Sequence, residues 1–283
     1  MKKSAMVFVV SLVAPSVLAW HDTGHMVIAS IAYPRLSAAA KTQVDRLLKI
    51  PLVGDPEKYD FVSASCWADD LKRKIKDHRY DAWHYIDLPF SADGTPGLQP
   101  DKENVVWAIN QAMATLKNPN SPDLEKARQL RFLLHFAGDV YMPLHCVSRF
   151  SKAHPKGDRG GNDFPIQWNN RRTNLHFFWD TAAGLFKEVK RPMMQEDQTL
   201  ISNWAKQITA SYPPSKFKEV SDMDVSHWAK EGLVACKTFV YSLPEGQNPP
   251  AAYVSRAQEV SKKRIALAGY RLAAFLNSAF KTR

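Results

Sequence analysis

The sequence predicts an all-α fold built as a single domain, with one short β-hairpin and long loops on its functional side. Apolar residues recur at helical spacing through most of the chain, which is the main signal of amphipathic helices. The 283 residues are 45% hydrophobic, enough for one large core. Neither an internal repeat nor a low-complexity linker divides the chain, so we expect one folded unit over residues 20–283.

The first nineteen residues have the pattern of a secretory signal peptide. Lys2 and Lys3 precede the apolar run "AMVFVVSLVA", and the small Val17 and Ala19 predict cleavage after Ala19. Cleavage there would give Trp20 a free α-amino group. The alternative is an N-terminal membrane anchor, but the run is short for a hydrocarbon core of ~30 Å. We therefore expect a secreted or periplasmic protein without a membrane span.

The net charge and the cysteine content bear on the kind of binding partner and on disulfide bonding. The formal net charge is +10, and a basic surface attracts polyanions such as nucleic acid or anionic lipid headgroups. The three cysteines are Cys66, Cys146 and Cys236. In an oxidising compartment an odd number permits one disulfide bond and one free thiol, and the spacing does not select the pair. One structural bridge or none is expected.

Three helices are predicted in the first half of the mature chain. Apolar periodicity marks residues 38–50 and 103–117. A third, largely buried helix covers residues 124–141 and follows Ser121, a typical cap residue with proline behind it. Pro143 should end or kink this helix, because proline cannot continue the helical hydrogen-bond pattern.

The middle of the chain is irregular and the last third is helical again. Residues 148–163 are rich in glycine and charge and read as an exposed loop. A short hairpin follows, with its turn near Asn169 and Asn170. The remaining predicted helices cover residues 199–212, 225–241 and 253–276.

Histidines and carboxylates occur together at spacings that suit metal binding. His135 and Asp139 are separated by four residues, as are His176 and Asp180, so each pair shares one helix face. His145 lies six residues after Asp139. Imidazole and carboxylate are ligands that zinc accepts. A buried histidine that only hydrogen-bonds to a carboxylate shows the same spacing. Each pair alone is therefore weak evidence for a metal site.

Further candidate ligands raise the weight of these pairs. "WAD" contains Asp69, "WHYID" contains His84 and Asp87, and the predicted mature N-terminus contains Trp20 and His25. Imidazoles, carboxylates and a free amine in one chain indicate a site for several metal ions.

Six motifs in a fixed order resemble a known family. The chain is similar to the single-strand-specific zinc nucleases of the S1/P1 type, which share a fold with bacterial zinc-dependent phospholipase C. The ordered set is specific, although each motif alone is not. The motifs are "WHDTGH", "WADD", "WHYID", "LLHFAGDVYMPLH", "GGND" and "NLHFFWD".

The resemblance implies three Zn²⁺ ions and a ligand set for each. Asp139 would be shared by two of them. The first zinc would take Asp69, His84, His135 and Asp139, the second the amine and carbonyl of Trp20 with His25 and Asp139, and the third His145, His176 and Asp180.

The resemblance also suggests catalytic and substrate-binding residues. Asp87 would orient or deprotonate the attacking water, or else hold a ligand histidine in place. Lys72 would add positive charge at the phosphorus, or else be an ordinary exposed lysine. Tyr85 would stack on a base. Asn162 would bind a base edge, or else cap the turn made by the glycines before it.

Three functions are weighed against one another. The favoured one is an exported, monomeric endonuclease that cuts single-stranded DNA and RNA to 5′-phosphate products, with 3′-nucleotidase activity as an extension. The rivals are a zinc phospholipase C and a basic nucleic-acid-binding protein without turnover. Asp180 and the five-residue step from Trp20 to His25 resemble the nuclease branch, and the sequence has no obvious lipid-binding β-domain.

Overall fold

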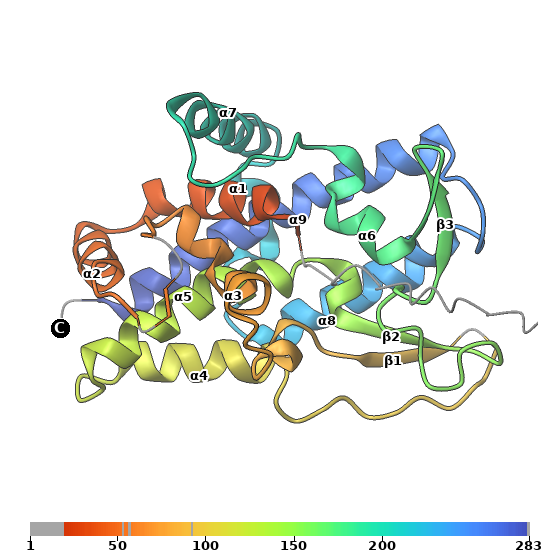
Figure 1. Cartoon of the computed structure of the whole chain (residues 1–283), viewed down its shortest axis with the longest axis horizontal. Helices are drawn as coiled ribbons and strands as arrows, with labels where there is room; N and C mark the ends of the chain where they lie inside the picture. Colours follow the sequence, from red (N-terminus) through yellow and green to blue (C-terminus); the bar gives the residue numbers. More distant parts are fainter. Residues whose placement is uncertain (1–19, 53, 56–57, 92, 282–283) are drawn as a thin grey trace, which may run out of the picture.

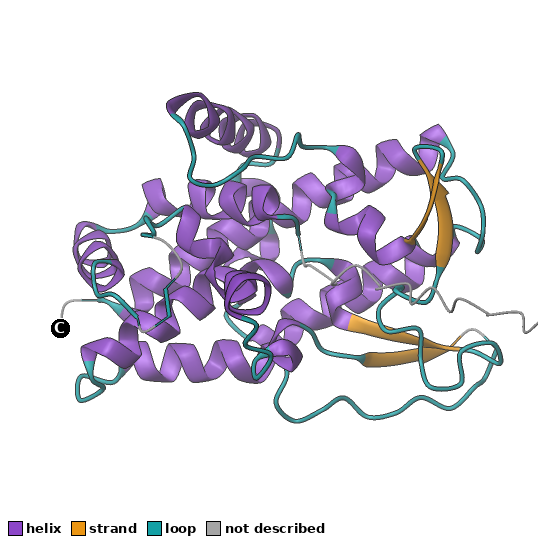
Figure 2. Ribbon diagram, viewed as in Figure 1, coloured by secondary structure: helices purple, strands orange, loops and turns teal. Residues whose placement is uncertain are grey.

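The computed structural model describes residues 20–52, 54–55, 58–91 and 93–281. Figures 1 and 2 show a mainly helical molecule with two small sheets, which confirms the predicted all-α class. The predicted signal peptide, residues 1–19, lies outside the described residues. The helices among them are α1 Asp22–Ala32, α2 Ala38–Leu48, α3 Trp67–Asp70, α4 Val105–Lys117, α5 Asp123–Asp139, α6 Leu175–Asp180, α7 Gln195–Ser211, α8 Val225–Thr238 and α9 Ala251–Ala279.

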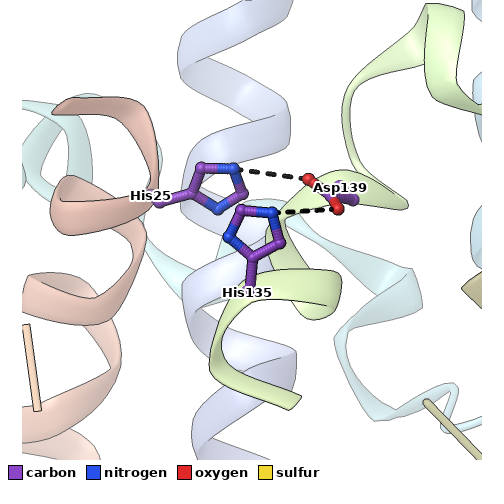
Figure 3. A group of neighbouring side chains, drawn as sticks. All are labelled: His25, His135 and Asp139. Atoms are coloured by element: carbon purple, nitrogen blue, oxygen red, sulfur yellow. Dashed lines mark ion pairs between the residues drawn. The ribbon is translucent and has the colours of Figure 1, made fainter. Parts of the chain in front are cut away.

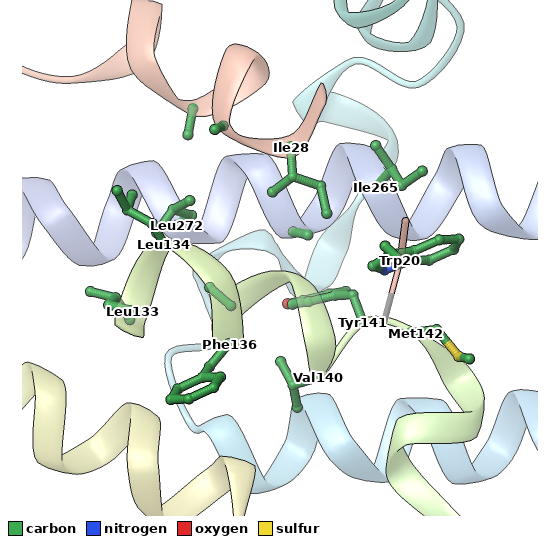
Figure 4. Close-up of a cluster of buried hydrophobic side chains, with 14 of the residues drawn as sticks. Trp20, Ile28, Leu133, Leu134, Phe136, Val140, Tyr141, Met142, Ile265 and Leu272 are labelled. Carbon is green, nitrogen blue, oxygen red and sulfur yellow. The ribbon is translucent and has the colours of Figure 1, made fainter. Parts of the chain in front are cut away.

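Helix α5 is the centre of the molecule. Every residue from 130 to 140 is buried, as expected of a helix that has neighbours on all sides. Helices α1, α2, α4 and α9 pack around it. Figure 4 shows part of this core, where Ile28, Leu134, Tyr141 and Ile265 come together from three helices and the turn after α5. A rigid core of this kind can hold side chains of α5 in fixed positions.

The predicted helices begin and end close to the expected residues, for local reasons. Asn104 accepts hydrogen bonds from the backbone N–H groups of Val106 and Trp107 and so caps α4. Helix α5 ends at Asp139, and Pro143 starts a 3₁₀ turn, Pro143–Cys146. This break turns the chain directly behind Asp139.

Two small sheets lie beside the helices. Strands β3 Pro165–Trp168 and β4 Arg171–Asn174 form the predicted antiparallel hairpin. Asn169 and Asn170 both have positive φ, the conformation that a two-residue hairpin turn needs. The sequence did not predict the second sheet, a parallel pair of β1 Leu88–Ser91 and β2 Val147–Phe150. That pair joins the chain after "WHYID" to the chain after His145.

Of the two expectations, one disulfide bond or none, the structure has none among the described cysteines. Cys66, Cys146 and Cys236 are all free and buried. The Cys66 thiol faces α1 and donates to the carbonyl oxygen of Asp22 over 3.6 Å, while the Cys146 thiol donates to the carbonyl oxygen of Val140 over 3.2 Å. The thiols therefore serve as small core groups. Among the described residues, each helix is too short or too polar to cross a bilayer.

Candidate metal centre and active site

Eight predicted ligand side chains converge from six segments around the carboxyl end of α5. All eight are buried, and the most exposed of them, His84, is only 8% exposed. Helix α5 supplies two of them on one face, and the break at Pro143 brings the next segment back beside them. The eight are His25, Asp69, His84, His135, Asp139, His145, His176 and Asp180.

The carboxylate of Asp139 lies at the middle of the first group. One oxygen, Oδ1, is 3.3 Å from His25 Nε2. The other, Oδ2, is 3.0 Å from His84 Nδ1 and 3.3 Å from His135 Nε2. Figure 3 shows His25 and His135 pointing at opposite oxygens of Asp139. Asp69 completes this group, with Oδ1 3.7 Å from His135 Nε2. One carboxylate thus faces two separate sets of donors, as a carboxylate bridging two ions would.

A second group consists of His145, His176 and Asp180. Their donor atoms lie within 4.8 Å of one another, close enough to hold one ion. The two Nε2 atoms are 3.2 Å apart, and His176 Nε2 is 3.5 Å from Asp180 Oδ1. The i, i+4 pair predicted on α6 therefore does meet the histidine from the turn after α5.

Backbone carbonyls fix the ring orientation of three histidines. His135 Nδ1 lies 2.7 Å from the carbonyl oxygen of Ser65, and His176 Nδ1 lies 2.7 Å from that of Gly160. His145 Nδ1 makes the same contact with the carbonyl oxygen of His84 at 2.7 Å. A carbonyl only accepts, so each Nδ1 carries a proton, and in a neutral ring the Nε2 then offers a lone pair.

The resulting arrangement of His145 and His176 fits a cation. Burial lowers the pKa of both rings, that of His176 to about 3, so both are neutral. Two lone pairs then face each other across 3.2 Å, which is unfavourable without a positive charge between them. Tetrahedral zinc with Zn–N distances near 2.0–2.1 Å would place two ligand nitrogens about 3.3 Å apart. The observed spacing matches that value.

Unpartnered buried atoms support the same conclusion. Asp69 Oδ2, Asp139 Oδ1, Asp180 Oδ1 and both ring nitrogens of His25 have no hydrogen-bond partner among the described residues. Burying such atoms unpaired is costly. Burial, followed by the nearby carboxylates of Asp69 and Asp139, raises the pKa of Asp180 well above its usual range. Cations would satisfy these atoms and offset the repulsion between the carboxylates.

Trp20 is fastened between the two groups. Its indole Nε1 donates to the carbonyl oxygen of Gly138 over 3.1 Å, and the next backbone N–H, of His21, donates to the carbonyl oxygen of Asp180 over 3.0 Å. Gly138 allows the close approach of α1, because a Cβ there would lie 2.6 Å from His25 Nδ1. The start of the described chain therefore lies beside Asp139.

A pocket of about 220 Å³ opens over the histidines. It contains all four residues predicted to act on substrate. The lining residues include Lys72, Tyr85, Asp87 and Asn162, together with His84, His145 and His176 at its base.

These four residues differ in their contacts. Asp87 lines the pocket and makes no hydrogen bond or ion pair with the described residues. Burial, then the charges of Asp158 and Asp101, raises the pKa of Asp87 to about 6. The side chain of Lys72 is 22% exposed and its Nζ lies 3.4 Å from Asp81 Oδ2. Lys72 is therefore a pocket residue rather than a freely solvated lysine.

Tyr85 and Asn162 are both accessible from the pocket. Tyr85 is 38% exposed, which is high for a large aromatic residue and suits a stacking surface. Asn162 Nδ2 donates to the carbonyl oxygen of Arg159 over 2.8 Å, so Asn162 does stabilise its turn. Its amide also lines the pocket, and the two roles are compatible.

Sequence reasoning assigned no role to two charged residues that line the pocket. Asp81 pairs with Lys72, and Arg159 lines the pocket while its guanidinium is paired with Asp163. Asp81 lies three residues before His84, within a turn, and nothing in its local pattern marks it. Arg159 was visible only as one of several basic residues in the 148–163 loop.

Fold and site together define a helical enzyme with a buried histidine–carboxylate centre below an open pocket. A family model described as S1/P1 Nuclease matches residues 20–281, and the chain belongs to this family. It is a nuclease, a hydrolase of phosphodiester bonds. This confirms the predicted family and enzyme class over the rival phospholipase and binding-protein functions.

Relatives of known name match along nearly the whole chain. The chain is 28% identical to "Endonuclease 2" of Arabidopsis thaliana, over 94% of this chain and 92% of that protein. It is 24% identical to "Nuclease S1" of Aspergillus oryzae, over 91% of each chain. "Nuclease P1" of Penicillium citrinum is also 24% identical, over 91% of this chain and 97% of that protein.

Proposed function

We propose that the protein is an exported, zinc-dependent endonuclease that cuts single-stranded DNA and RNA to 5′-phosphate products and also removes 3′-phosphates. The observation that carries the proposal is the pair of neutral imidazoles, His145 and His176, whose Nε2 lone pairs face each other 3.2 Å apart. That arrangement beside an unpartnered Asp180 oxygen suits zinc. The names of the relatives support cleavage of nucleic acid.

The three ions would use the ligand sets implied by the motifs. Asp139 would contribute one oxygen to each of two ions, because its Oδ1 faces His25 and its Oδ2 faces His84 and His135. Trp20 would contribute its amine and carbonyl once residues 1–19 are removed. The third ion would be held by His145, His176 and Asp180.

The chain's own residues would bind substrate and move a proton. The bound ions supply a water of lowered pKa and positive charge for the phosphate oxygens. Asp87, which has no hydrogen-bond or ion-pair partner among the described residues, would accept the proton from the attacking water. Lys72 would leave Asp81 to contact a phosphate oxygen. The pocket of about 220 Å³ would receive the scissile phosphodiester group of a flexible strand.

A preference for single strands follows from Tyr85. A base can stack on its exposed ring only after leaving its neighbours, which costs little in a single strand and much in a duplex. The basic chain would attract the backbone without regard to sequence.

The proposal is tested by assaying one preparation on four substrates. Single-stranded DNA and RNA should be cleaved, duplex DNA should be cut far more slowly, and phosphatidylcholine should be untouched. A chelator should abolish cleavage and added Zn²⁺ should restore it. Headgroup release from phosphatidylcholine without nucleic-acid cleavage, or full cleavage after metal removal, would contradict the proposal.

Tyr85→Ala should weaken substrate binding without removing the metal. Loss of one stacked base is worth about 1–3 kcal/mol, so KM for single-stranded DNA should rise by about 5- to 150-fold. Steady-state kinetics on a short oligonucleotide measures this. Tyr85→Phe keeps the ring and should keep KM near the wild-type value, and an equal defect in both variants would argue against stacking.

A further inference from the structure

A short segment before α7 contacts the first turn of α1. We call residues 187–191 the strap. The backbone N–H of Val189 donates to Thr23 Oγ1 over 2.9 Å, and Thr23 Oγ1 donates in turn to the carbonyl oxygen of Lys187 over 3.4 Å. At the end of the strap, the guanidinium of Arg191 reaches Asp22. Two successive residues of α1 are therefore fixed by the strap.

Arg191 also joins α1 to α3. Its Nη2 is 2.8 Å from Asp22 Oδ2 and 2.8 Å from Asp70 Oδ1, while its Nη1 is 2.7 Å from Asp70 Oδ2. Arg73 bridges the same two carboxylates, at 2.7 Å from Asp22 Oδ1 and 3.2 Å from Asp70 Oδ1. Tyr59 donates to Asp70 over 2.7 Å. Two acids and two arginines thus share one charged network, and Lys74 joins it with its Nζ 3.4 Å from Asp70 Oδ2.

The network is placed next to the metal ligands in sequence. Asp22 lies between Trp20 and His25, and Asp70 directly follows Asp69. Any movement of Asp22 relative to Asp70 would therefore move Trp20 and His25 relative to Asp69. These residues are proposed ligands of the two ions that share Asp139.

Burial of these charges favours a positioning role over a stabilising one. The side chains of Arg191 and Asp70 are 4% and 0% exposed. Removing two charges from water costs about as much as their attraction returns, so a buried ion pair is weak evidence for stability. What such a network does provide is one defined arrangement, because a planar guanidinium meets carboxylates only in a few geometries.

The start of α1 needs external support. Its N-cap, His21, makes no side-chain capping hydrogen bond. Chain ends fray unless they are held, and ligands must be placed to within about 0.5 Å. Cleavage before Trp20 would put a chain end two residues from Asp22, held otherwise through the hydrogen bonds of Trp20 to Gly138 and of the His21 N–H to Asp180.

We propose that the strap and Arg191 position the N-terminal metal site: they hold Asp22 and Thr23 against α3, so that Trp20 and His25 meet Asp69 and Asp139 at the distances an ion requires. Arg191 is thus a positioning residue that touches neither substrate nor metal. The inference rests on the proposed zinc chemistry.

The test compares zinc retention in Arg191→Met and wild-type mature protein. Methionine is about as long as the aliphatic part of the arginine side chain and lacks the guanidinium group. Against a graded zinc chelator, Arg191→Met should release one of three zinc ions at a free-zinc level about 10- to 100-fold higher than wild type, with the other two less affected. Arg191→Lys, which keeps the charge, should recover part of the loss.

Arg271→Met is the matched control. Arg271 is also buried and paired with a carboxylate, Glu231, at 2.9 Å, but on α9. It should lose comparable thermal stability in the zinc-free state and retain all three zinc ions. Asp22→Asn is a milder change and serves as the test variant if Arg191→Met does not fold. It should also weaken the binding of one zinc ion.

The outcomes separate the two proposals. A wild-type chain that binds no zinc would overturn both. Wild type with three zinc ions, and Arg191→Met and Asp22→Asn with unchanged retention, would overturn the positioning role alone. Equal zinc loss in Arg271→Met would do the same, because it would reduce the effect to general destabilisation.

Discussion

Asp139→Asn should lower nuclease activity by about 1,000-fold or more and leave a protein with fewer than three zinc ions. The reason is that both oxygens of Asp139 face donor sets, His25 on one side and His84 with His135 on the other. An amide nitrogen cannot serve as an anionic bridge, so one ion loses its carboxylate, and metal assistance is worth several kcal/mol of transition-state stabilisation. Turnover of single-stranded DNA and zinc content, measured on one sample, check the expectation.

Asp45→Asn is the control for this change. Asp45 accepts hydrogen bonds from the hydroxyl of Tyr33 and has no part in the metal centre. It should keep full activity and all three zinc ions. Wild-type turnover in Asp139→Asn would mean that the carboxylate at the middle of the site is not needed for catalysis.

A mature chain with one extra residue before Trp20 should lose most of its activity. The extension turns the amine of Trp20 into an amide, which is a far poorer ligand, while the indole of Trp20 can still donate to Gly138. The zinc affinity of one site should fall by at least about 10-fold, since even the loss of a group that hydrogen-bonds to a ligand lowers metal affinity by about 10- to 100-fold. Zinc retention against a chelator and turnover measure both effects.

An extra residue at the carboxyl end, after Arg283, is the matched control and should change neither quantity. Full zinc retention and full turnover in the N-terminally extended chain would exclude the amine as a ligand. The expected loss bears on export as well, because removal of residues 1–19 would then be a step in making the active site.

Local patterns were enough to predict most of the helices and the pairs within them. His135 with Asp139 and His176 with Asp180 lie four residues apart, so their proximity is a property of the helix, although apolar periodicity marks only the helix of the first pair. Asn169 and Asn170 mark the hairpin for a similar reason, since asparagine tolerates positive φ. These features depend on neighbours in sequence.

Contacts between distant segments were not predictable in the same way. The carbonyls of Ser65 and Gly160 that fix His135 and His176 carry no side-chain signature. Arg191 binds Asp22 across 169 residues, and nothing near Arg191 points to that partner. The ordered motifs implied that the ligands meet, but not which groups hold them in place.

The cysteines show the limit of a compositional argument. Three cysteines allow one disulfide bond or none, and in the structure all three thiols are free and buried. Cys66 lies against the start of α1, and Cys146 lies close against Gly232 of α8. Burial raises the pKa of both thiols, which keeps them protonated and unreactive.

The number of zinc ions per mature chain tests the central claim most directly. The chain starting at Trp20 is dialysed against metal-free buffer, and zinc and protein are measured in the same sample by atomic emission and amino-acid analysis. We predict three zinc ions per chain, together with cleavage of single-stranded DNA that a chelator abolishes. A chain that cleaves single-stranded DNA at full rate with one zinc ion or none would contradict the account.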